Sequence, residues 1–309
     1  MREPAMKPVL VVHGGAARLS AAQRLPAARA PFEAGMGEAI AAGMAVLQKG
    51  GAARDAVVEA VAALEDNPIF NAGRGSVYCR DGSVECCASV MCAETERAGA
   101  GALIQRVRNP VRAARLVLDH EHTLIVGETL EQLAREAGLD MVRSDYHMTP
   151  HRRAQWDRFK HRKEVVLDPT EFEEAEINVG ADLPKGTVGA VAFDQRGQLA
   201  AATSTGGLVN QLPGRIGDSP VIGAGTWADQ RVAVSATGDG DVFARVAFAR
   251  RIADLIELRG VLPSTAARRA LADVASGGGE GGCVMLDARG RVFGLHNSPD
   301  MHWASSEDG

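Results

Sequence analysis

The segment from Lys185 to Val191 (KGTVGAV) constrains the chain most, because it places a threonine directly after a glycine at the start of an apolar strand. Glycine at position 186 gives the backbone freedom at the carbonyl that would be attacked. A threonine freed at its own N-terminus can use its α-amine to activate its hydroxyl. The pattern indicates a nucleophile, Thr187, that is masked until the Gly186–Thr187 bond is cut. An ordinary strand start is the alternative, since Gly-Thr-Val also suits a plain β-strand.

A second pattern lies in the following loop, which is rich in glycine and proline and carries Arg215 and Asp218 three positions apart. Arginine holds a carboxylate with a two-pronged hydrogen bond, and an aspartate can hold an ammonium group. Together they match the α-carboxylate and α-amine of a free amino acid. The alternative is a surface ion pair, which the neighbouring threonine makes the weaker interpretation.

Five segments, in order along nearly the whole chain, resemble the plant-type L-asparaginase/isoaspartyl peptidase family of N-terminal-nucleophile hydrolases. They are residues 12–16 (VHGGA), 64–75 (LEDNPIFNAGRG), 186–191 (GTVGAV), 202–220 and 236–240 (ATGDG). The resemblance implies self-cleavage into an α subunit, 1–186, and a β subunit, 187–309. It further implies hydrolysis of the side-chain amide of L-asparagine and of the isopeptide bond of β-aspartyl dipeptides, which releases aspartate.

The resemblance also implies a role for each matching residue. Thr187 would be the nucleophile, and Thr205 would hydrogen-bond to it and tune its basicity. Arg215 and Asp218 would anchor the substrate's α-carboxylate and α-amine. The remaining roles fall to Thr237 and Gly238 for oxyanion and substrate, Gly240 for the amino-acid pocket, and Asn71 for assistance to processing from behind the nucleophile.

No cofactor is required by this chemistry, but the family resemblance implies a structural sodium ion held in a loop. Backbone carbonyls suit a hard monovalent cation, although nothing in the side chains of this loop demands one. The carbonyls would be those of Leu64, Glu65, Asn67, Phe70, Ala72 and Arg74.

Several residues depart from the family pattern. Cys87 and Cys92 stand where aspartates are usual and Ala93 where glycine is usual, in a segment typical of a core strand, so we expect altered packing there and no loss of chemistry. Gln211 replaces a frequent lysine. Asp239 stands where threonine is common, and an acid beside the oxyanion donors would disfavour negative charge and alter rate and substrate range.

Composition narrows the class of protein. The 309 residues are 46% apolar, which is enough for a sizeable core, and the net charge of −5 with mixed signs gives no reason to expect nucleic-acid binding. No apolar run reaches membrane-spanning length, and residues 1–7 lack the apolar core of a signal peptide. A cytoplasmic protein that acts on small molecules is therefore expected, with a dimer of αβ heterodimers implied by the resemblance.

The cysteines and histidines favour structural roles over metal binding. Five cysteines, an odd number without a Cys-x-x-Cys motif, indicate buried apolar residues in a reducing compartment. No tetrahedral zinc ligand set is evident. His120 with His122, and His147 with His151, lack a third ligand nearby and are interpreted as solvated or core histidines.

Hydrophobic spacing predicts alternating strands and helices in one domain. With the family resemblance deciding between α/β layerings, we expect a four-layer α-β-β-α sandwich. The predicted helices span 34–47, 53–64, 110–118, 130–136, 242–258 and 264–276. The predicted strands span 9–12, 76–79, 83–91, 100–107, 123–126, 188–193, 199–204, 221–224, 232–236, 283–286 and 291–296, the last of which would end the fold.

Residues from about 143 to 186 are polar and weakly periodic, which predicts a mobile linker before the scissile bond. A tether of this kind would let the new termini leave the active site. A helical hairpin with a solvated face is the alternative.

Two rival functions remain on sequence grounds. A glycosylasparaginase-type N4-amidohydrolase would share Thr187, Arg215 and Asp218, but no signal peptide or disulfide framework supports its secretory route. An unprocessed, non-catalytic protein that binds aspartate-like amino acids would remain a single uncut chain.

Overall fold

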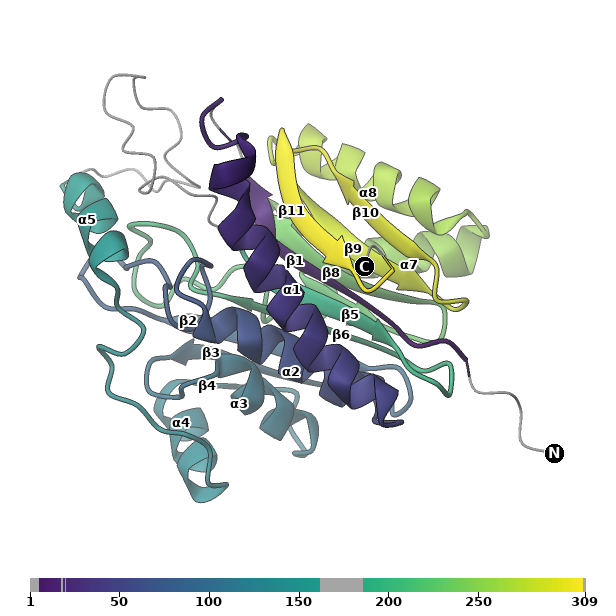
Figure 1. Cartoon of the computed structure of the whole chain (residues 1–309), viewed down its shortest axis with the longest axis horizontal. Helices are drawn as coiled ribbons and strands as arrows, with labels where there is room; N and C mark the ends of the chain where they lie inside the picture. The colour runs from purple at the N-terminus through teal and green to yellow at the C-terminus, as the bar shows by residue number, and fades with distance from the viewer. Residues whose placement is uncertain (1–5, 18, 20, 162–185, 308–309) are drawn as a thin grey trace.

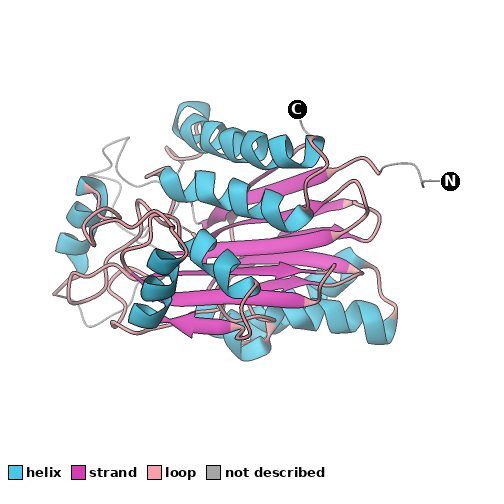
Figure 2. Ribbon diagram, turned by 90° about the horizontal axis from the view of Figure 1, so that it is seen from below, coloured by secondary structure: helices cyan, strands magenta, loops and turns pink. Residues whose placement is uncertain are grey.

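Two stacked β-sheets with helices on both outer faces make up the computed structural model, which describes residues 6–17, 19, 21–161 and 186–307 (Figures 1 and 2). The larger sheet has the strand order β11-β1-β5-β6-β2-β3-β4, and the smaller sheet has the order β10-β9-β8-β7. All pairings are antiparallel except that between β3 and β4. The predicted α-β-β-α sandwich is confirmed.

The larger sheet consists of β1 (Val9–Ala17), β2 (Cys86–Cys92), β3 (Arg97–Ile104), β4 (Leu124–Val126), β5 (Val188–Phe193), β6 (Leu199–Thr205) and β11 (Asp300–Ser305). The smaller sheet consists of β7 (Thr226–Ala228), β8 (Val232–Gly238), β9 (Gly281–Asp287) and β10 (Val292–His296).

The helices divide between the two outer faces. The outer face of the larger sheet packs against α1 (Pro26–Gln48), α2 (Ala53–Asp66) and α3 (Pro110–Leu118), with α4 (Gly127–Glu136) beside β3 and β4. The smaller sheet packs against α7 (Phe248–Arg259) and α8 (Pro263–Ser276). In the sequence, the short helix α6 (Gly240–Val246) follows β8 and precedes α7.

Strand β5 shows how the sequence sets these layers. Its side chains alternate between two apolar surroundings: Val188, Ala190 and Ala192 pack against the helix layer, whereas Val191 and Phe193 pack between the sheets. A strand that is buried on both faces has an almost continuous apolar sequence, which is why residues 188–193 are easy to predict as a strand.

Strand pairing fixes the place of the candidate nucleophile. Val188 is the register partner of Ser204, so Thr187, immediately before β5, lies beside Thr205, the last residue of β6. The chain runs continuously through Gly186 and Thr187, so this is the uncut polypeptide.

Four element predictions were wrong. Residues 76–79 form a loop, and residues 221–224 form a turn with the strand β7 starting only at Thr226. The helix predicted over 242–258 is two helices, because Ala247 has φ +50° and breaks the helical path. The last strand is β11, whose mixed pattern of polar and apolar residues conceals its pairing with β1.

The predicted linker was also wrong over its first part, because residues 150–159 form α5 (Pro150–Phe159). Thr149 caps this helix by accepting a hydrogen bond from the Arg152 backbone N–H at 3.2 Å. The Arg152 side chain is buried and donates to the Gly75 carbonyl, and Trp156 stacks on Tyr78. The remainder of the predicted linker, residues 162–185, lies outside the described residues.

All five cysteines are buried and unbridged, as predicted. The predicted core strand with Cys87 and Cys92 is β2, which is buried along its whole length. His147 is fully buried, and burial lowers its pKa to about 4. Within the described parts of the chain, no helix has the length and apolarity needed to cross a bilayer.

Candidate active site

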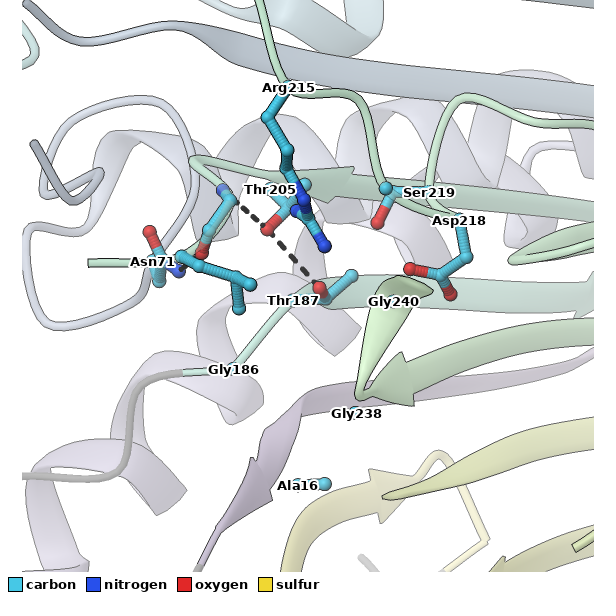
Figure 3. A pocket seen from close by; sticks show the side chains of 13 residues that line it. Ala16, Asn71, Gly186, Thr187, Thr205, Arg215, Asp218, Ser219, Gly238 and Gly240 are labelled. Atoms are coloured by element: carbon cyan, nitrogen blue, oxygen red, sulfur yellow. Dashed lines mark hydrogen bonds between the residues drawn. The ribbon is translucent and has the colours of Figure 1, made fainter. Parts of the chain in front are cut away.

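One pocket collects most of the site residues predicted from the sequence. Asn71, Gly186, Thr187, Thr205, Arg215, Asp218, Gly238 and Gly240 all line it (Figure 3). They come from the ends of strands in both sheets, the loop after α2, the loop between β6 and β7 and the start of α6. The residues predicted from the sequence thus gather in one pocket, which is also lined by residues to which the sequence analysis gave no role: Ala16, Gly207, Leu208, Gly217 and Ser219.

Thr187 is held at the floor of this pocket with little solvent exposure. Its Oγ1 lies 3.2 Å from the Oγ1 of Thr205 and donates a hydrogen bond to it. Thr205 Oγ1 also accepts the Gly207 backbone N–H at 3.0 Å, which fixes the position of its oxygen (Figure 3). The predicted contact between the two threonines is therefore present in the uncut chain.

Asn71 shapes the loop behind the two threonines. Its side-chain nitrogen donates to the Gly207 carbonyl at 2.8 Å, and its side-chain oxygen accepts the Val77 backbone N–H at 3.0 Å. A Cβ at Gly206 would lie only 2.6 Å from that oxygen, so the loop after Thr205 fits around the amide. Asn71 thus joins the loop after β6 to the loop before β2.

Asp218 is an almost fully buried carboxylate whose Oδ2 has no hydrogen-bond partner among the described residues. Burial raises its pKa to about 7, although the nearby Arg215 charge acts in the opposite direction. A buried polar atom without a partner is costly. The cost disappears when a cationic ligand group supplies both a charge and hydrogen-bond donors.

Arg215 is the cationic partner in the pocket, and in the ligand-free site its ion pair is with Asp241, not with Asp218. Its Nη2 lies 2.9 Å from Asp241 Oδ2, and Asp241 is largely exposed. Figure 3 shows the Arg215 guanidinium and the Asp218 carboxylate reaching into the pocket near Thr187. A guanidinium and a carboxylate in one pocket are the groups that pair with the two charged ends of an α-amino acid.

Residues at the end of β8 and just after it differ in whether they line the pocket. Gly238 and Gly240 line the pocket, but the Thr237 side chain is fully buried and its Oγ1 accepts the Ala16 backbone N–H at 3.0 Å. That oxygen lies against Gly186, where a Cβ would approach it to 2.9 Å. Thr237 therefore lies behind the scissile bond and outside the pocket wall.

Asp239, the departure from the family pattern between these glycines, precedes the first turn of α6 and is half-buried. Burial and the neighbouring Asp241 both raise its pKa. Asp239 therefore adds a third carboxyl to Asp218 and Asp241, near Arg215 and Arg245.

Gly15 explains why the stretch after His13 needs small residues. Its φ is +115°, and a Cβ there would lie 2.5 Å from the Gly186 Cα. The β1 backbone therefore presses directly against the residue whose carbonyl precedes Thr187. A side chain at either position would push the two backbones apart.

The loop predicted to hold sodium curls tightly after α2. Three of its carbonyls already accept backbone hydrogen bonds: Leu64 from Asn67, Glu65 from Arg74, and Asn67 from Phe70. A carbonyl oxygen has two lone pairs, so each retains capacity for a cation. The buried Glu65 side chain of this loop accepts hydrogen bonds from Ser204 Oγ and the Val111 N–H at its Oε1, and burial raises its pKa to about 8.

The prediction that His120 and His122 lack a third ligand group nearby was wrong. The side-chain ligand atoms of His120, Glu121 and His122 lie within 4.8 Å of one another, so Glu121 is a nearby third group that the sequence argument overlooked. Glu121 and His122 are strongly exposed.

A sandwich of this type, with a threonine at the start of a central strand in the pocket, defines the N-terminal-nucleophile class of hydrolases. The sequence profile of the family described as Asparaginase matches residues 6–309, and the chain belongs to this family.

Similar proteins cover nearly the same length. The chain is 42% identical to an isoaspartyl peptidase of Salmonella typhimurium, across 96% of this chain and 95% of that protein. It is 39% identical to an isoaspartyl peptidase/L-asparaginase of Danio rerio, across 98% and 94%. It is also 39% identical to a plant-type L-asparaginase of Pyrococcus abyssi, across 97% and 96%.

Proposed function

We propose that this protein is a self-processing threonine hydrolase that releases aspartate from L-asparagine and from β-aspartyl dipeptides. The observation that carries the proposal is the shared pocket of Thr187, Arg215 and Asp218, in which one hydroxyl faces an unsatisfied carboxylate and a guanidinium. The names of the three relatives support the same substrate class. One is an isoaspartyl peptidase, one a plant-type L-asparaginase, and one carries both names.

The first step would be self-cleavage. Thr187 Oγ1 attacks the Gly186 carbonyl carbon, the C–N bond breaks, and an ester joins Gly186 to the threonine oxygen. Water then hydrolyses the ester, which leaves a carboxylate on Gly186 and a free α-amine on Thr187. The close packing of Gly15 and Thr237 against Gly186 would hold the scissile bond in place during this step.

Turnover would use the new amine as the base. The Thr187 amine takes the proton from its own hydroxyl as the oxygen attacks the substrate's side-chain carbonyl. That proton passes to the departing ammonia or amino acid as the C–N bond breaks. Water hydrolyses the resulting β-aspartyl ester and regenerates the hydroxyl. Thr205, at 3.2 Å, would orient the Thr187 oxygen throughout.

Substrate binding would rest on the two charged residues. Arg215 would exchange its exposed partner Asp241 for the substrate α-carboxylate, and the α-ammonium would pair with the Asp218 carboxylate in the same pocket. Thr237 and Gly238 would support the oxyanion, and a single oxyanion donor is typically worth about 3 kcal/mol in such reactions. Because Thr237 is buried behind Gly186, its contribution would begin only after Gly186 moves away.

The substrate assignment is tested by aspartate release from asparagine and from β-aspartyl-leucine, measured side by side on purified protein. We expect release from both, together with two bands on a denaturing gel that sum to the full chain. An uncut chain that binds aspartate without hydrolysing either substrate would instead identify a binding protein.

We also propose that the loop from Leu64 to Arg74 binds a sodium ion through its carbonyls and thereby stiffens the site that contains Asn71. The curled backbone supports this proposal. Thermal unfolding in sodium chloride should give a higher Tm than in choline chloride at the same ionic strength. Equal values would argue against the site.

On the family resemblance we further infer a cytoplasmic dimer of cleaved αβ heterodimers. Sedimentation of the processed protein should give a mass near twice that of one full chain, and a mass near one chain would contradict the assembly.

A further inference from the structure

The layer between the two sheets changes in character along the strands. At one end it is apolar, with Val9 and Val11 of β1, Phe193 of β5 and Leu286 of β9 in a single cluster. At the end near Thr187 the same strand faces carry polar side chains. His13 continues the face of Val9 and Val11, and Thr203 continues the face of Leu199 and Ala201.

These polar residues form a continuous hydrogen-bonded chain. His13 Nε2 lies 2.9 Å from Ser235 Oγ, and Ser235 Oγ lies 2.7 Å from Thr203 Oγ1. Thr203 is 2.6 Å from Thr226, Thr226 is 2.8 Å from Ser89, and Ser89 Oγ donates to the Ser219 carbonyl at 2.6 Å. We call this series of groups the hydroxyl chain. All of its side chains are completely buried.

Register explains how the hydroxyl chain is assembled. In the larger sheet His13 pairs with Gly189, Gly189 with Thr203, and Thr203 with Ser89, so they form one row across four strands. In the smaller sheet Ser235 pairs with Thr226 and faces this row. Gly189 leaves the necessary space, because a Cβ there would lie 1.9 Å from Ser235 Oγ and 2.5 Å from His13 Nε2.

Backbone carbonyls tie the hydroxyl chain to both sheets. Thr203 Oγ1 donates to the Gly225 carbonyl at 3.3 Å, and Ser235 Oγ donates to the Ala202 carbonyl at 3.1 Å. Each hydroxyl has one proton and several acceptors within reach. Hydrogen bonds of such a network in a low-dielectric interior reinforce one another.

The two ends of the hydroxyl chain touch the two functional parts of the site. At one end His13 is the register partner of Gly189 in β5, two residues after Thr187. At the other end the Ser219 carbonyl belongs to the residue after Asp218, and Ser219 also lines the pocket. The hydroxyl chain thus connects β5, which Thr187 directly precedes, to the loop that carries Asp218.

We propose that the hydroxyl chain is a positioning device that sets the spacing between Thr187 and Asp218. This inference rests on the proposed function, because it concerns the same substrate. An aspartyl substrate is anchored at its α-amine and attacked at its side-chain carbonyl, so both groups must be held at one fixed separation. A misplacement of about 1 Å can cost on the order of 100-fold in rate.

The state of His13 fits this device. Burial lowers its pKa to about 3, so the ring is neutral at physiological pH and has one N–H. His13 therefore anchors the end of the hydroxyl chain as a neutral ring through its 2.9 Å bond to Ser235 Oγ, and it is not a base for the reaction.

The test replaces the middle of the hydroxyl chain. Thr203→Val keeps the shape but removes the hydroxyl, and Thr203→Ser restores it. We expect Thr203→Val to lower kcat for asparagine about tenfold or more, with a smaller change in KM. Self-cleavage, whose carbonyl is already attached to the chain and does not use Asp218, should stay within about twofold of wild type.

Controls separate positioning from folding and from the function itself. Ser305→Ala removes a buried hydroxyl on β11 outside the hydroxyl chain and should leave both rates unchanged. Thr203→Ser should recover most of kcat. If Thr203→Val fails to fold, Ser89→Ala, which removes the links to Thr226 and to the Ser219 carbonyl, is measured instead with the same expectation. Unchanged turnover, or parallel loss of turnover and self-cleavage, would overturn the proposal.

A readout independent of activity is the nitrogen-15 NMR signal of the His13 ring, which bonds to Ser235 and through it to Thr203. Thr203→Val should shift the ring nitrogen signals, and Ser305→Ala should not. Unchanged signals in Thr203→Val would contradict a continuous hydroxyl chain even in a fully active enzyme, whereas an inactive wild-type protein would count against the proposed function alone.

Discussion

The two ends of the layer between the sheets are built from the same strands but depend on different forces. The end at Phe193 and Leu286 is an apolar core, in which burial stabilises the fold without fixing any atom closely. The end at His13 and Thr203 consists of directional bonds between buried groups. The interior of one sandwich therefore holds the sheets together at one end and positions the candidate site at the other.

The largest effect should come from the pocket at the polar end. Asp218→Asn removes the charge that would receive the substrate ammonium, and breaking a buried ion pair costs about 3–5 kcal/mol. We therefore expect kcat/KM for asparagine to fall at least about 100-fold. Asp241→Asn is the matched control, since it makes the same chemical change at an exposed carboxylate nearby. Equal losses in the two variants would count against a special role for Asp218.

At the apolar end the expected effect is on stability. Leu286→Ala opens a cavity between the sheets and should lower the free energy of unfolding by about 2–5 kcal/mol. The processed enzyme should keep its kcat within about twofold at a temperature where it is folded. Urea unfolding and steady-state kinetics on the same sample would check this, and a large fall in kcat with little loss of stability would remove the distinction between the two ends.

A pH effect should follow from Asp218. Its pKa of about 7 is raised by burial, so the carboxyl takes up a proton as pH falls through 7 and can no longer pair with an ammonium group. KM for asparagine should rise about tenfold between pH 8 and pH 6.

The raised pKa of Asp218 also affects folding stability, which should fall as pH rises, whereas substrate binding should improve. Because the folded pKa lies above the ordinary value of 3.8, folding stability is lost as pH rises from about 4 to 7. Asp218→Asn should therefore be less sensitive to pH in both KM and Tm over this range. A KM that stays flat in the wild-type protein would show that Asp218 ionises normally.

The smallest effect concerns the exposed partner of Arg215. Asp241→Asn should free the guanidinium for the substrate carboxylate, but exposed ion pairs are weak. We expect KM for asparagine to fall by no more than a few-fold, with kcat unchanged. A rise in KM would mean that Asp241 helps to hold Arg215 in its binding position.

The sequence predicted those features that depend on local pattern. The apolar runs of β5 and β6 follow from strand patterning, and the pocket residues Thr187, Arg215 and Asp218 follow from motif chemistry, whereas the layered fold was chosen through the family resemblance. The break at Ala247 was not predictable, because alanine strongly favours helix and its positive φ arises from tertiary packing. Helix α5 was missed because its stabilising contacts, such as Arg152 to Gly75, link residues far apart in sequence.

The hydroxyl chain lay beyond sequence reasoning for a similar reason. Thr203, Ser235 and Thr226 look like ordinary polar strand residues until the register of two separate sheets brings them together. Likewise, Thr237 matched the family motif, but only packing shows that its side chain lies behind Gly186. The roles of all these residues in processing and turnover stay predictions.

The most direct test of the central claim is the intact mass of the purified protein and of its Thr187→Ala variant, measured together with aspartate release. Wild type should give two polypeptides that begin and end at the Gly186–Thr187 bond and should release aspartate, whereas the variant should remain one inactive chain. A variant that is cut at this bond, or that turns over asparagine, would contradict Thr187 as the nucleophile.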